Sequence, residues 1–364
     1  MSMIIAKGWV RHEQAAITRQ VRTAFGTMDA RHAVFLVLQD EAGRRGVGES
    51  WVNFPAWAPW ERRSALERGL IPWLVGQAVE DVPTCMERLY RAFRGPAQQS
   101  GTLGPLLQAL CAVELALWDL AAQQAGVPLA SLLFDAPRRR VRVYASGINA
   151  PIPWALIDQH LEWGVDLFKL KLGFGDEDDR RNLGALADYV AGKARLAVDV
   201  NRGWSLNQAL GWLPVLRAHE VQWLEEPLRA EEEHYTRELR TAGLVPIAGA
   251  ENTLLPPGCD VAALAAEPWD IWQPDVTKYA PLHVARRLIA PVTARGRRII
   301  PHFLGSAPGQ AASLHLAAGC PDALVEWDIN ANPLRTDLCE PPFRIEEGAI
   351  ALPERPGLGW RLKG

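Results

Sequence analysis

Three short stretches decide the fold: Ala197-Val-Asp-Val-Asn201, Trp223-Leu-Glu-Glu-Pro227 and Gly249-Ala-Glu-Asn252. Each carries an acid where a short apolar run ends, and these acids, Asp199, Glu225 and Glu251, are spaced 26 residues apart. Because this interval is about one strand-helix unit, it places the three carboxylates at one height on neighbouring parallel strands. Acids are also favoured at the starts of helices, but three in this register favour a shared site.

The second half of the chain alternates between strand-like and helix-like segments. Eight short apolar segments are predicted strands: Val141–Ser146, Leu167–Leu172, Arg195–Val200, Val221–Glu225, Pro246–Glu251, Asp270–Pro274, Arg298–His302 and Ala323–Glu326. Helical periodicity lies between most of them, as at Arg180–Gly192 and Leu206–His219. This alternation predicts parallel strands, and eight of them predict a closed barrel across residues 138–340.

The first 125 residues predict a separate α+β domain, in which strands precede helices. Residues Leu106–Ala122 are apolar on nearly every face, which predicts a buried helix. The segment Phe343–Leu352 is a predicted hairpin. We expect this hairpin to fold back onto the N-terminal domain, so that residues 341–364 complete the domain formed by residues 1–125.

Composition and charge exclude several classes of function. Of the 364 residues, 48% are hydrophobic and 22% are charged, and the net charge of −3 gives no field that would attract nucleic acid or an anionic membrane. No apolar run approaches the roughly 20 residues that span a membrane. The cysteines follow no pairing pattern, so we expect reduced thiols and a cytoplasmic protein. They are Cys85, Cys111, Cys259, Cys320 and Cys339.

Two lysines lie on one predicted strand, in Leu167-Phe-Lys-Leu-Lys-Leu172. Residues two apart on a strand point to the same face, so Lys169 and Lys171 both point into the barrel or both point out. Pointing outward would place two charges against the helix layer, which favours the inward direction. A partly desolvated lysine among other cations has a lowered pKa and can act as a base.

A histidine and an aspartate end two adjacent predicted strands, in Arg298-Ile-Ile-Pro-His302 and Asp270-Ile-Trp-Gln-Pro-Asp275. A carboxylate that accepts from one ring nitrogen fixes the tautomer of a histidine and makes the other nitrogen more basic. We therefore interpret His302 and Asp275 as a catalytic dyad. On the eighth strand, Glu326 could donate a hydrogen bond to a developing oxyanion if it is protonated.

The three acids predict a metal ion, because carboxylates that converge repel each other unless a cation lies among them. Hard oxygen ligands suit Mg²⁺, with one ion for each active site. Removal of the proton next to a substrate carboxylate creates a dianionic enediolate, which a divalent ion can stabilise. The residues therefore predict a magnesium-dependent proton abstraction, with Lys171 and His302 as bases on opposite faces of the substrate.

Together these motifs resemble the enolase superfamily, and the Lys-x-Lys motif with the His–Asp pair resembles its mandelate racemase subgroup. The motifs, in sequence order, are Phe168-Lys-Leu-Lys171, Val198-Asp-Val-Asn201, Trp223-Leu-Glu-Glu-Pro227, Gly249-Ala-Glu-Asn252, Gln273-Pro-Asp-Val-Thr-Lys278 and Pro301-His302. The resemblance implies an α/β protein with a modified (β/α)7β TIM barrel and an α+β N-terminal capping domain, commonly as a homo-oligomer. It covers nearly the whole chain.

The resemblance also implies a role for each matching residue. Asp199, Glu225 and Glu251 would hold Mg²⁺, and Lys171 and His302 would be the two acid/base groups. Lys169 would assist electrostatically, Asp275 would support the histidine, and Glu326 would stabilise the enediolate. Two further residues would support the metal site from outside its ligands, Asn201 and Lys278.

Loops of the capping domain are expected to close over the substrate. The stretch Thr18-Arg-Gln-Val-Arg-Thr-Ala-Phe25 offers Arg19, Gln20 and Arg22, which suit hydroxyl groups or a distal carboxylate. The stretch Trp51-Val-Asn-Phe-Pro-Ala-Trp57 offers Trp51 and Phe54, which suit an apolar group. The two stretches point to different substrates.

The leading hypothesis is dehydration of a hydroxy or sugar acid to a 2-keto acid, in which His302 protonates the leaving β-hydroxyl. The alternative is racemisation or epimerisation by 1,1-proton transfer, which the same two bases allow. A cycloisomerase fits less well, because relatives with that activity usually use a lysine pair. A barrel that only binds a metal or a carboxylate would leave Lys171, His302 and Asp275 without a purpose. The expected partner is a small-molecule carboxylate, with no nucleic acid and no membrane.

Overall fold

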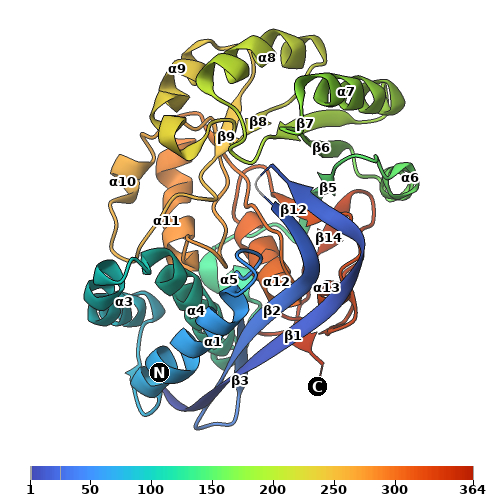
Figure 1. The fold of residues 1–364 in the computed structure, drawn as a ribbon. Coiled ribbons are helices and arrows are strands. Elements are labelled where there is room, and N and C mark those ends of the chain that lie inside the picture. Colours follow the sequence, from blue (N-terminus) through green and yellow to red (C-terminus); the bar gives the residue numbers. More distant parts are fainter. Residues whose placement is uncertain (1, 25, 364) are drawn as a thin grey trace.

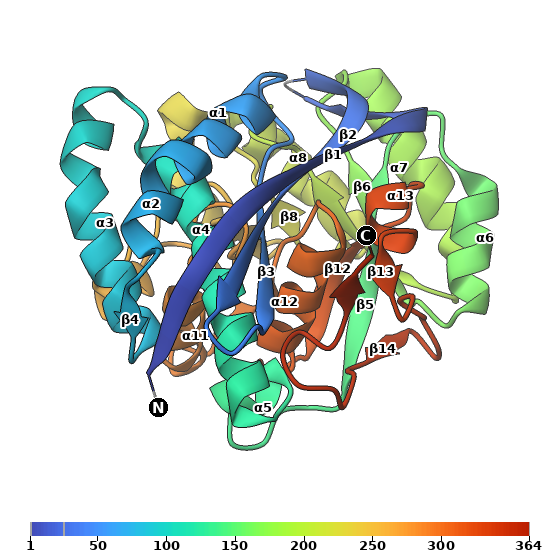
Figure 2. The same ribbon diagram turned by 90° about the horizontal axis from the view of Figure 1, so that it is seen from below.

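The computed structural model describes residues 2–24 and 26–363, which form an N-terminal α+β domain and a parallel barrel (Figure 1). The N-terminal sheet is antiparallel and has the order β3-β2-β1-β4. Its strands are β1 (Met3–Thr23), β2 (Gly26–Asp40), β3 (Arg45–Ser50) and β4 (Ala78–Val79). The long β1–β2 hairpin runs across the molecule, with its tip towards β6 and α7 (Figure 2).

Helices cover one side of this sheet. They are α1 (Ala58–Ala65), the π-helical turn η1 (Leu66–Leu70), α2 (Ile71–Leu74), α3 (Val82–Gln99), α4 (Leu103–Ala125) and α5 (Leu129–Leu133). Helix α4 packs closely against β3, because a Cβ on Gly46 or Gly48 would lie only 2.1 or 1.9 Å from a carbonyl oxygen of that helix. The predicted buried helix is confirmed. Although α4 is long and apolar enough to cross a membrane, 83% of its apolar window is buried inside the protein.

All eight predicted barrel strands are present in the described residues, as parallel neighbours in the order β11-β10-β9-β8-β7-β6-β5-β12. Their bounds are β5 (Arg140–Ile148), β6 (Leu167–Lys171), β7 (Arg195–Asp199), β8 (Leu224–Glu225), β9 (Ile247–Gly249), β10 (Ile271–Trp272), β11 (Arg298–Ile299) and β12 (Leu324–Asp328). Between the two end strands, the Glu326 amide donates to the Pro301 carbonyl at 3.4 Å. The sheet therefore curls until its ends meet.

The inside of the barrel begins with a buried apolar layer to which each strand region contributes one residue. These residues are Tyr144, Leu167, Ala197, Trp223, Ala248, Ile271, Ile300 and Leu324. Side chains two residues further along each strand face the same interior and lie nearer the carboxyl ends of the strands. We call this apolar layer the floor of the site, because the polar residues lie next to it on the side of the carboxyl ends of the strands.

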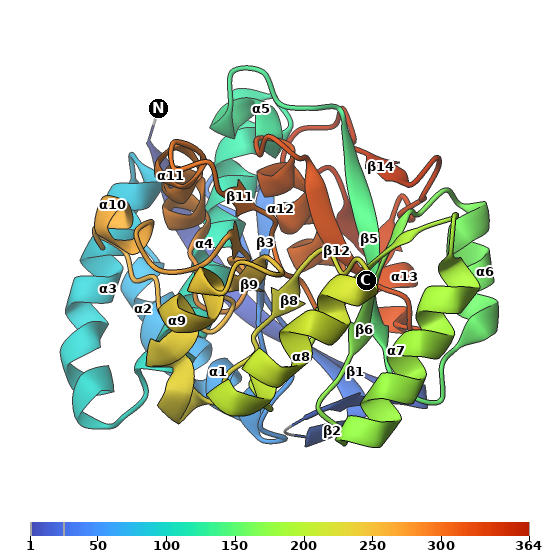
Figure 3. The ribbon, with the colours of Figure 1, turned by 90° about the horizontal axis from the view of Figure 1, so that it is seen from above.

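The outer ring of helices lies outside the strands (Figure 3). It consists of α6 (Trp154–Glu162), α7 (Asp176–Val190), α8 (Leu206–Ala218), the 3-10 turn η2 (Ala230–Tyr235), α9 (Thr236–Thr241), α10 (Val261–Leu264), α11 (Leu282–Thr293), α12 (Ala307–Ala317) and α13 (Pro333–Thr336). Apolar strands on one side and amphipathic helices on the other bury one continuous core around the barrel.

The C-terminal segment lies differently from the expectation. Its hairpin is closed by a Glu346–Ala349 bridge, and β14 (Ala349–Ala351) pairs with barrel strand β5 rather than with the N-terminal sheet. An exposed edge at the start of β5 offers backbone partners that the hairpin takes up. Strands β13 (Cys339–Glu340) and β15 (Arg361–Leu362) pair with each other, and Leu362 packs on the N-terminal sheet. The limits of the two domains stay a prediction.

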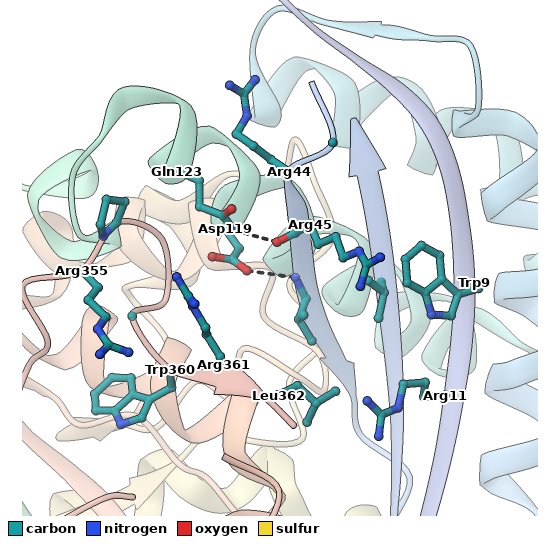
Figure 4. Close-up of a pocket in the computed structure, with 15 residues that line it drawn as sticks. Trp9, Arg11, Arg44, Arg45, Asp119, Gln123, Arg355, Trp360, Arg361 and Leu362 are labelled. Atoms are coloured by element: carbon teal, nitrogen blue, oxygen red, sulfur yellow. Dashed lines mark hydrogen bonds between the residues drawn. The ribbon is translucent and has the colours of Figure 1, made fainter. Parts of the chain in front are cut away.

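A cleft of about 800 Å³ lies between the N-terminal sheet and the C-terminal segment (Figure 4). At its base Asp119 accepts hydrogen bonds from the Val47 and Leu358 amides, at 3.0 and 2.8 Å. Exposed arginines surround it, among them Arg45, Arg355 and Arg361. The cleft is lined by residues near the open end of the β1–β2 hairpin, far along that hairpin from its tip.

Candidate active site

Above the apolar floor, alternate barrel strands contribute a layer of four buried polar side chains. They are Lys169, Glu225, Gln273 and Glu326, each at most 2% exposed. Lys169 forms ion pairs with Glu225 and, at 2.8 Å, with Glu326. Burial disfavours the charge of Lys169, but these two carboxylates outweigh it and raise the pKa of the ammonium well above its usual value. The inward direction predicted for the lysine pair is therefore the one observed.

Lys171 lies two residues after Lys169, nearer the carboxyl end of β6, and it contacts the end of β7. Its Nζ donates to Asp199 Oδ2 at 2.9 Å and to Asn201 Oδ1 at 2.8 Å. The Asn201 amide groups in turn donate to both oxygens of Asp199, at 2.8 and 3.0 Å. Burial disfavours the charge of Asp199, yet Lys171 and Lys169 outweigh it and lower the pKa of that carboxyl group.

Glu251 reaches the barrel interior through an unusual backbone conformation. It follows Ala250, whose φ of 86° is rare for a residue with a side chain and marks local strain. Glu251 Oε1 lies 3.2 Å from Lys278 Nζ, and Oε2 lies 2.7 Å from His302 Nε2. Against the effect of burial, His302 and Lys278 lower the pKa of Glu251 well below its usual value.

The structure brings His302 and Asp275 together, with Nδ1 of the histidine 2.9 Å from Asp275 Oδ2. The other oxygen of Asp275 accepts from the amide and hydroxyl of Thr277, at 2.8 and 2.6 Å, so the carboxylate is fixed. Burial disfavours the imidazolium, but Glu251, Glu326 and Asp275 raise the pKa of His302 well above its usual value. His302 is thus suited to hold a proton.

Glu326 lies between the lysine and the histidine. Its Oε2 is 3.6 Å from His302 Nε2 and accepts from the Phe303 amide at 3.1 Å. Burial raises its pKa, but Lys169 and His302 outweigh this and lower it overall. The lowered pKa favours the ionised form of Glu326, which accepts hydrogen bonds, whereas donation to an oxyanion would require the protonated form.

Three functional neighbours were missed by the sequence interpretation. Glu226 is buried, holds the Ala250 amide at 3.1 Å, and has a pKa raised to about 8, mainly by burial and by Glu251. Trp223 and Gln273 both donate to Glu225. The signal for Trp223 was its position two residues before Glu225 on the same strand, which places both side chains on one face.

The arginines of the hairpin tip contact the protein itself. Arg19 donates to Asn330 Oδ1 at 3.0 Å and to the Asn149 carbonyl at 2.6 Å, so it joins the tip to the barrel. Arg22 lies 5.5 Å from the Phe174 ring centroid. The predicted Gln20 side chain lies outside the described part of the structure.

The second capping stretch approaches the acid cluster through an aromatic ring. Lys278 Nζ lies 4.7 Å from the Trp51 ring centroid, and Phe54 lies 6.5 Å from Trp51. Lys278 also donates to Asn252 at 2.7 Å. By contrast, Trp57 is 66% exposed and is the N-cap residue that precedes helix α1.

The donor set of the three acids fits Mg²⁺ in chemistry. The three acids were expected to converge, but among the described residues no three acidic, histidine or cysteine side chains lie together as metal ligands do. Asp199 and Glu251 instead contact lysine, asparagine and histidine groups. Burial raises the pKa of Glu225 to about 7 against the pull of Lys169, and Asp199 and Glu251 add to the shift. Buried hard-oxygen donors that repel each other are the set that a small divalent cation neutralises.

Known protein families and solved structures match this chain along nearly its whole length. Two family models match the chain: "Mandelate racemase / muconate lactonizing enzyme, N-terminal domain" over residues 6–133 and "Enolase C-terminal domain-like" over residues 155–364. A crystal structure of a mandelate racemase/muconate lactonizing enzyme from Bordetella bronchiseptica RB50 is 34% identical, with a TM-score of 0.86, and covers 99% of this chain and 97% of that one.

Curated relatives carry out several reactions. The chain is 28% identical to a D-galactarolactone cycloisomerase from Agrobacterium fabrum, over 91% of this chain and 89% of that protein. It is 29% identical to an L-Lys-D/L-Arg epimerase from Methylococcus capsulatus, over 98% and 99%. Other relatives are dehydratases of arabinonate, talarate/galactarate and xylonate. A racemase from Streptomyces coelicolor A3(2) with the same fold has bound magnesium.

Proposed function

The chain belongs to the enolase superfamily, in the group of mandelate racemase and muconate lactonizing enzyme, and on that premise we propose that it dehydrates a small hydroxy or sugar acid to a 2-keto acid. Relatives in three reaction classes support an enzyme of this superfamily that acts on a small molecule. The observation that carries the proposal is that the two candidate proton-transfer groups contact different predicted metal ligands. Lys171 contacts Asp199, and His302 contacts Glu251.

Asp199, Glu225 and Glu251 would hold one Mg²⁺. When bound, the ion supplies positive charge to the oxygens of the substrate carboxylate and of the enediolate. Asn201 would keep Asp199 oriented, and Lys278 would do the same for Glu251. Lys169, fixed between Glu225 and Glu326, would add a second positive charge at the floor of the site.

The reaction then requires two proton transfers. In its neutral form Lys171 takes the α-proton, and the electron pair moves into the enediolate. The imidazolium of His302 gives its proton to the β-hydroxyl, which leaves as water while the enol forms, and the enol becomes the 2-keto acid by tautomerisation. Asp275 keeps the histidine oriented and favours its protonated state.

The alternative is epimerisation by 1,1-proton transfer, in which His302 returns a proton to the α-carbon instead. The aromatic ring of Trp51 over Lys278 favours this outcome for a substrate with an apolar group. Both reactions share the first step, so they differ only in the fate of the enediolate. A barrel that binds a metal or carboxylate without reaction is the third and weakest candidate.

Proton NMR in D₂O with Mg²⁺ and a library of hydroxy and sugar acids tests the proposal. A 2-keto product supports dehydration, whereas exchange of the α-proton with inversion supports epimerisation. Lys171→Ala should abolish exchange on one substrate face only, and His302→Asn on the other. Loss of both exchanges in either variant would argue against two independent bases.

The remaining expectations accompany this proposal. We infer a cytoplasmic homo-oligomer that binds neither nucleic acid nor membrane. The five cysteines are all unpaired, and four of them are buried, as expected for reduced thiols.

A further inference from the structure

Glu225 differs from the other two predicted ligands in how its oxygens are held. Its Oε2 accepts one hydrogen bond from Trp223 Nε1 at 3.0 Å and another from Gln273 Nε2 at 2.7 Å. Its Oε1 faces the ammonium group of Lys169. Both donors to Oε2 are neutral groups that do not titrate near neutral pH, and both are completely buried.

The two donors are fixed by the barrel itself. The Trp223 ring lies in the apolar floor, edge-on to Tyr144, with ring centroids 5.3 Å apart and planes at 87°. Gln273 follows β10, and its backbone N–H donates to the Gly249 carbonyl at 2.8 Å. Both side chains are completely buried, so neither can turn away without disturbing a packed layer.

Each of the other two acids has at least one charged partner, and Asp199 also accepts from the neutral amide groups of Asn201 on both of its oxygens. Asp199 has Lys171 and Asn201 as partners, and Glu251 has Lys278 and His302. Lysine side chains have several rotatable bonds and move readily when a cation arrives. Glu225 therefore has one oxygen that accepts from two neutral, buried donors and one oxygen that faces the ammonium group of Lys169.

We propose that Trp223 and Gln273 restrict Glu225 to a single metal-binding oxygen and thereby set the preference of the site for Mg²⁺ over Ca²⁺. Ca²⁺ takes about 6–8 oxygens and often binds both oxygens of one carboxylate, whereas Mg²⁺ takes six at shorter distance. To bind through both oxygens, Glu225 would have to leave two buried donors without an acceptor. This inference rests on the proposed magnesium site and adds a selectivity mechanism to it.

Isothermal titration calorimetry of the full, metal-free chain tests the proposal, with MgCl₂ and CaCl₂ as separate titrants. The variants are Trp223→Phe, Gln273→Met and the double variant, which remove the donors and largely keep the volume. In the double variant we expect the ratio Kd(Ca²⁺)/Kd(Mg²⁺) to fall by about ten-fold, within the range that groups supporting metal ligands produce. The Mg²⁺ affinity should change less than the Ca²⁺ affinity.

Trp272→Phe is the matched control, because Trp272 is an equally buried tryptophan whose Nε1 has no partner within the described residues. Its Kd ratio should equal that of the parent. An unchanged ratio in the double variant, or equal weakening of both metals, would overturn the proposal. If the double variant does not fold by circular dichroism, Gln273→Met alone decides. If the parent chain binds no Mg²⁺, the proposed metal site fails as well, which separates that outcome from a failure of selectivity alone.

Discussion

The barrel mouth and the arginine-lined cleft both contain several charged side chains, but those at the mouth are buried and ion-paired, whereas those in the cleft are exposed. At the mouth, Lys169, Glu225 and Glu326 are buried and ion-paired with one another. In the cleft, Arg355 and Arg361 are exposed, and neither guanidinium group has an ion pair among the described residues. Charge at the surface is inexpensive, whereas burying it costs free energy unless partners compensate. Buried, compensated charge is therefore the better indicator of a catalytic site than the size of a cleft.

The strongest way to break this comparison is to remove the buried lysine that we propose as the base. Lys171→Ala should lower kcat by roughly 10³-fold on the acid that the NMR screen identifies, because general base catalysis typically contributes about 10²–10⁴-fold. Lys193→Ala, which removes a lysine outside the barrel, serves as the control and should leave kcat unchanged. A loss below ten-fold in Lys171→Ala would mean that this lysine is not the base.

The second test concerns a buried ion pair at the rim of the mouth. Arg31 of β2 pairs with Asp328 of β12, and both are at most 3% exposed. Arg31→Met should lower the apparent free energy of unfolding by about 3 kcal/mol, because the carboxylate loses its direct partner in a buried site. Urea titration measures this change. A change in the free energy of unfolding near zero would show that Arg335, which also lies beside Asp328, replaces the lost charge.

The third test uses pH. Burial raises the pKa of Glu49 to about 7, despite hydrogen bonds from Ser306 and Gly309. Because its unfolded pKa is near 4.5, the folded chain binds an extra proton between these values, and stability falls as pH rises through that window. The full effect is about 3 kcal/mol. Between pH 5 and pH 8, urea titrations should therefore show a larger decrease in the free energy of unfolding for the parent chain than for Glu49→Gln. An equal decrease would contradict the assignment to Glu49.

The smallest effect is expected in the cleft. The double variant Arg355→Ala/Arg361→Ala should change the apparent free energy of unfolding by less than about 0.5 kcal/mol and leave kcat unchanged, as for most exposed positions. Urea titration and steady-state kinetics check both values. A ten-fold change in kcat would show that the cleft communicates with the barrel mouth, and the contrast between the two regions would no longer hold.

Much of the barrel could be predicted because its signals are local. Apolar runs that end in Asp199 and Glu225 mark strand ends, and the two-residue spacing of Lys169 and Lys171 gives their shared direction. The meeting of His302 with Asp275 required only that adjacent strands lie side by side. Strand period and strand order together were sufficient for these residues.

The remaining features depend on contacts between distant segments. Lys169 and His302 lower the pKa of Glu326, and no spacing rule in the sequence relates these residues to it. The hairpin that contains β14 pairs with β5 because that strand has a free edge, and the sequence does not display an edge. Gln273 was visible in a motif, but its bond to Glu225 crosses the barrel interior. Tertiary contact, rather than local propensity, decides each of these.

The tip of the β1–β2 hairpin packs against two glycines, which have no side chains. A Cβ on Gly173 or Gly203 would lie 3.2 or 3.0 Å from the methyl group of Ala24, and these glycines follow the strands that carry Lys171 and Asp199. A side chain at either glycine would therefore crowd Ala24, and one at Gly173 would also strain a backbone with a φ of 97°. The distance between the hairpin tip and the ends of β6 and β7 is thus limited by two residues without side chains. For an engineer who wishes to change how closely the tip approaches the barrel, Gly203 is the better position, because it lacks the positive φ of Gly173.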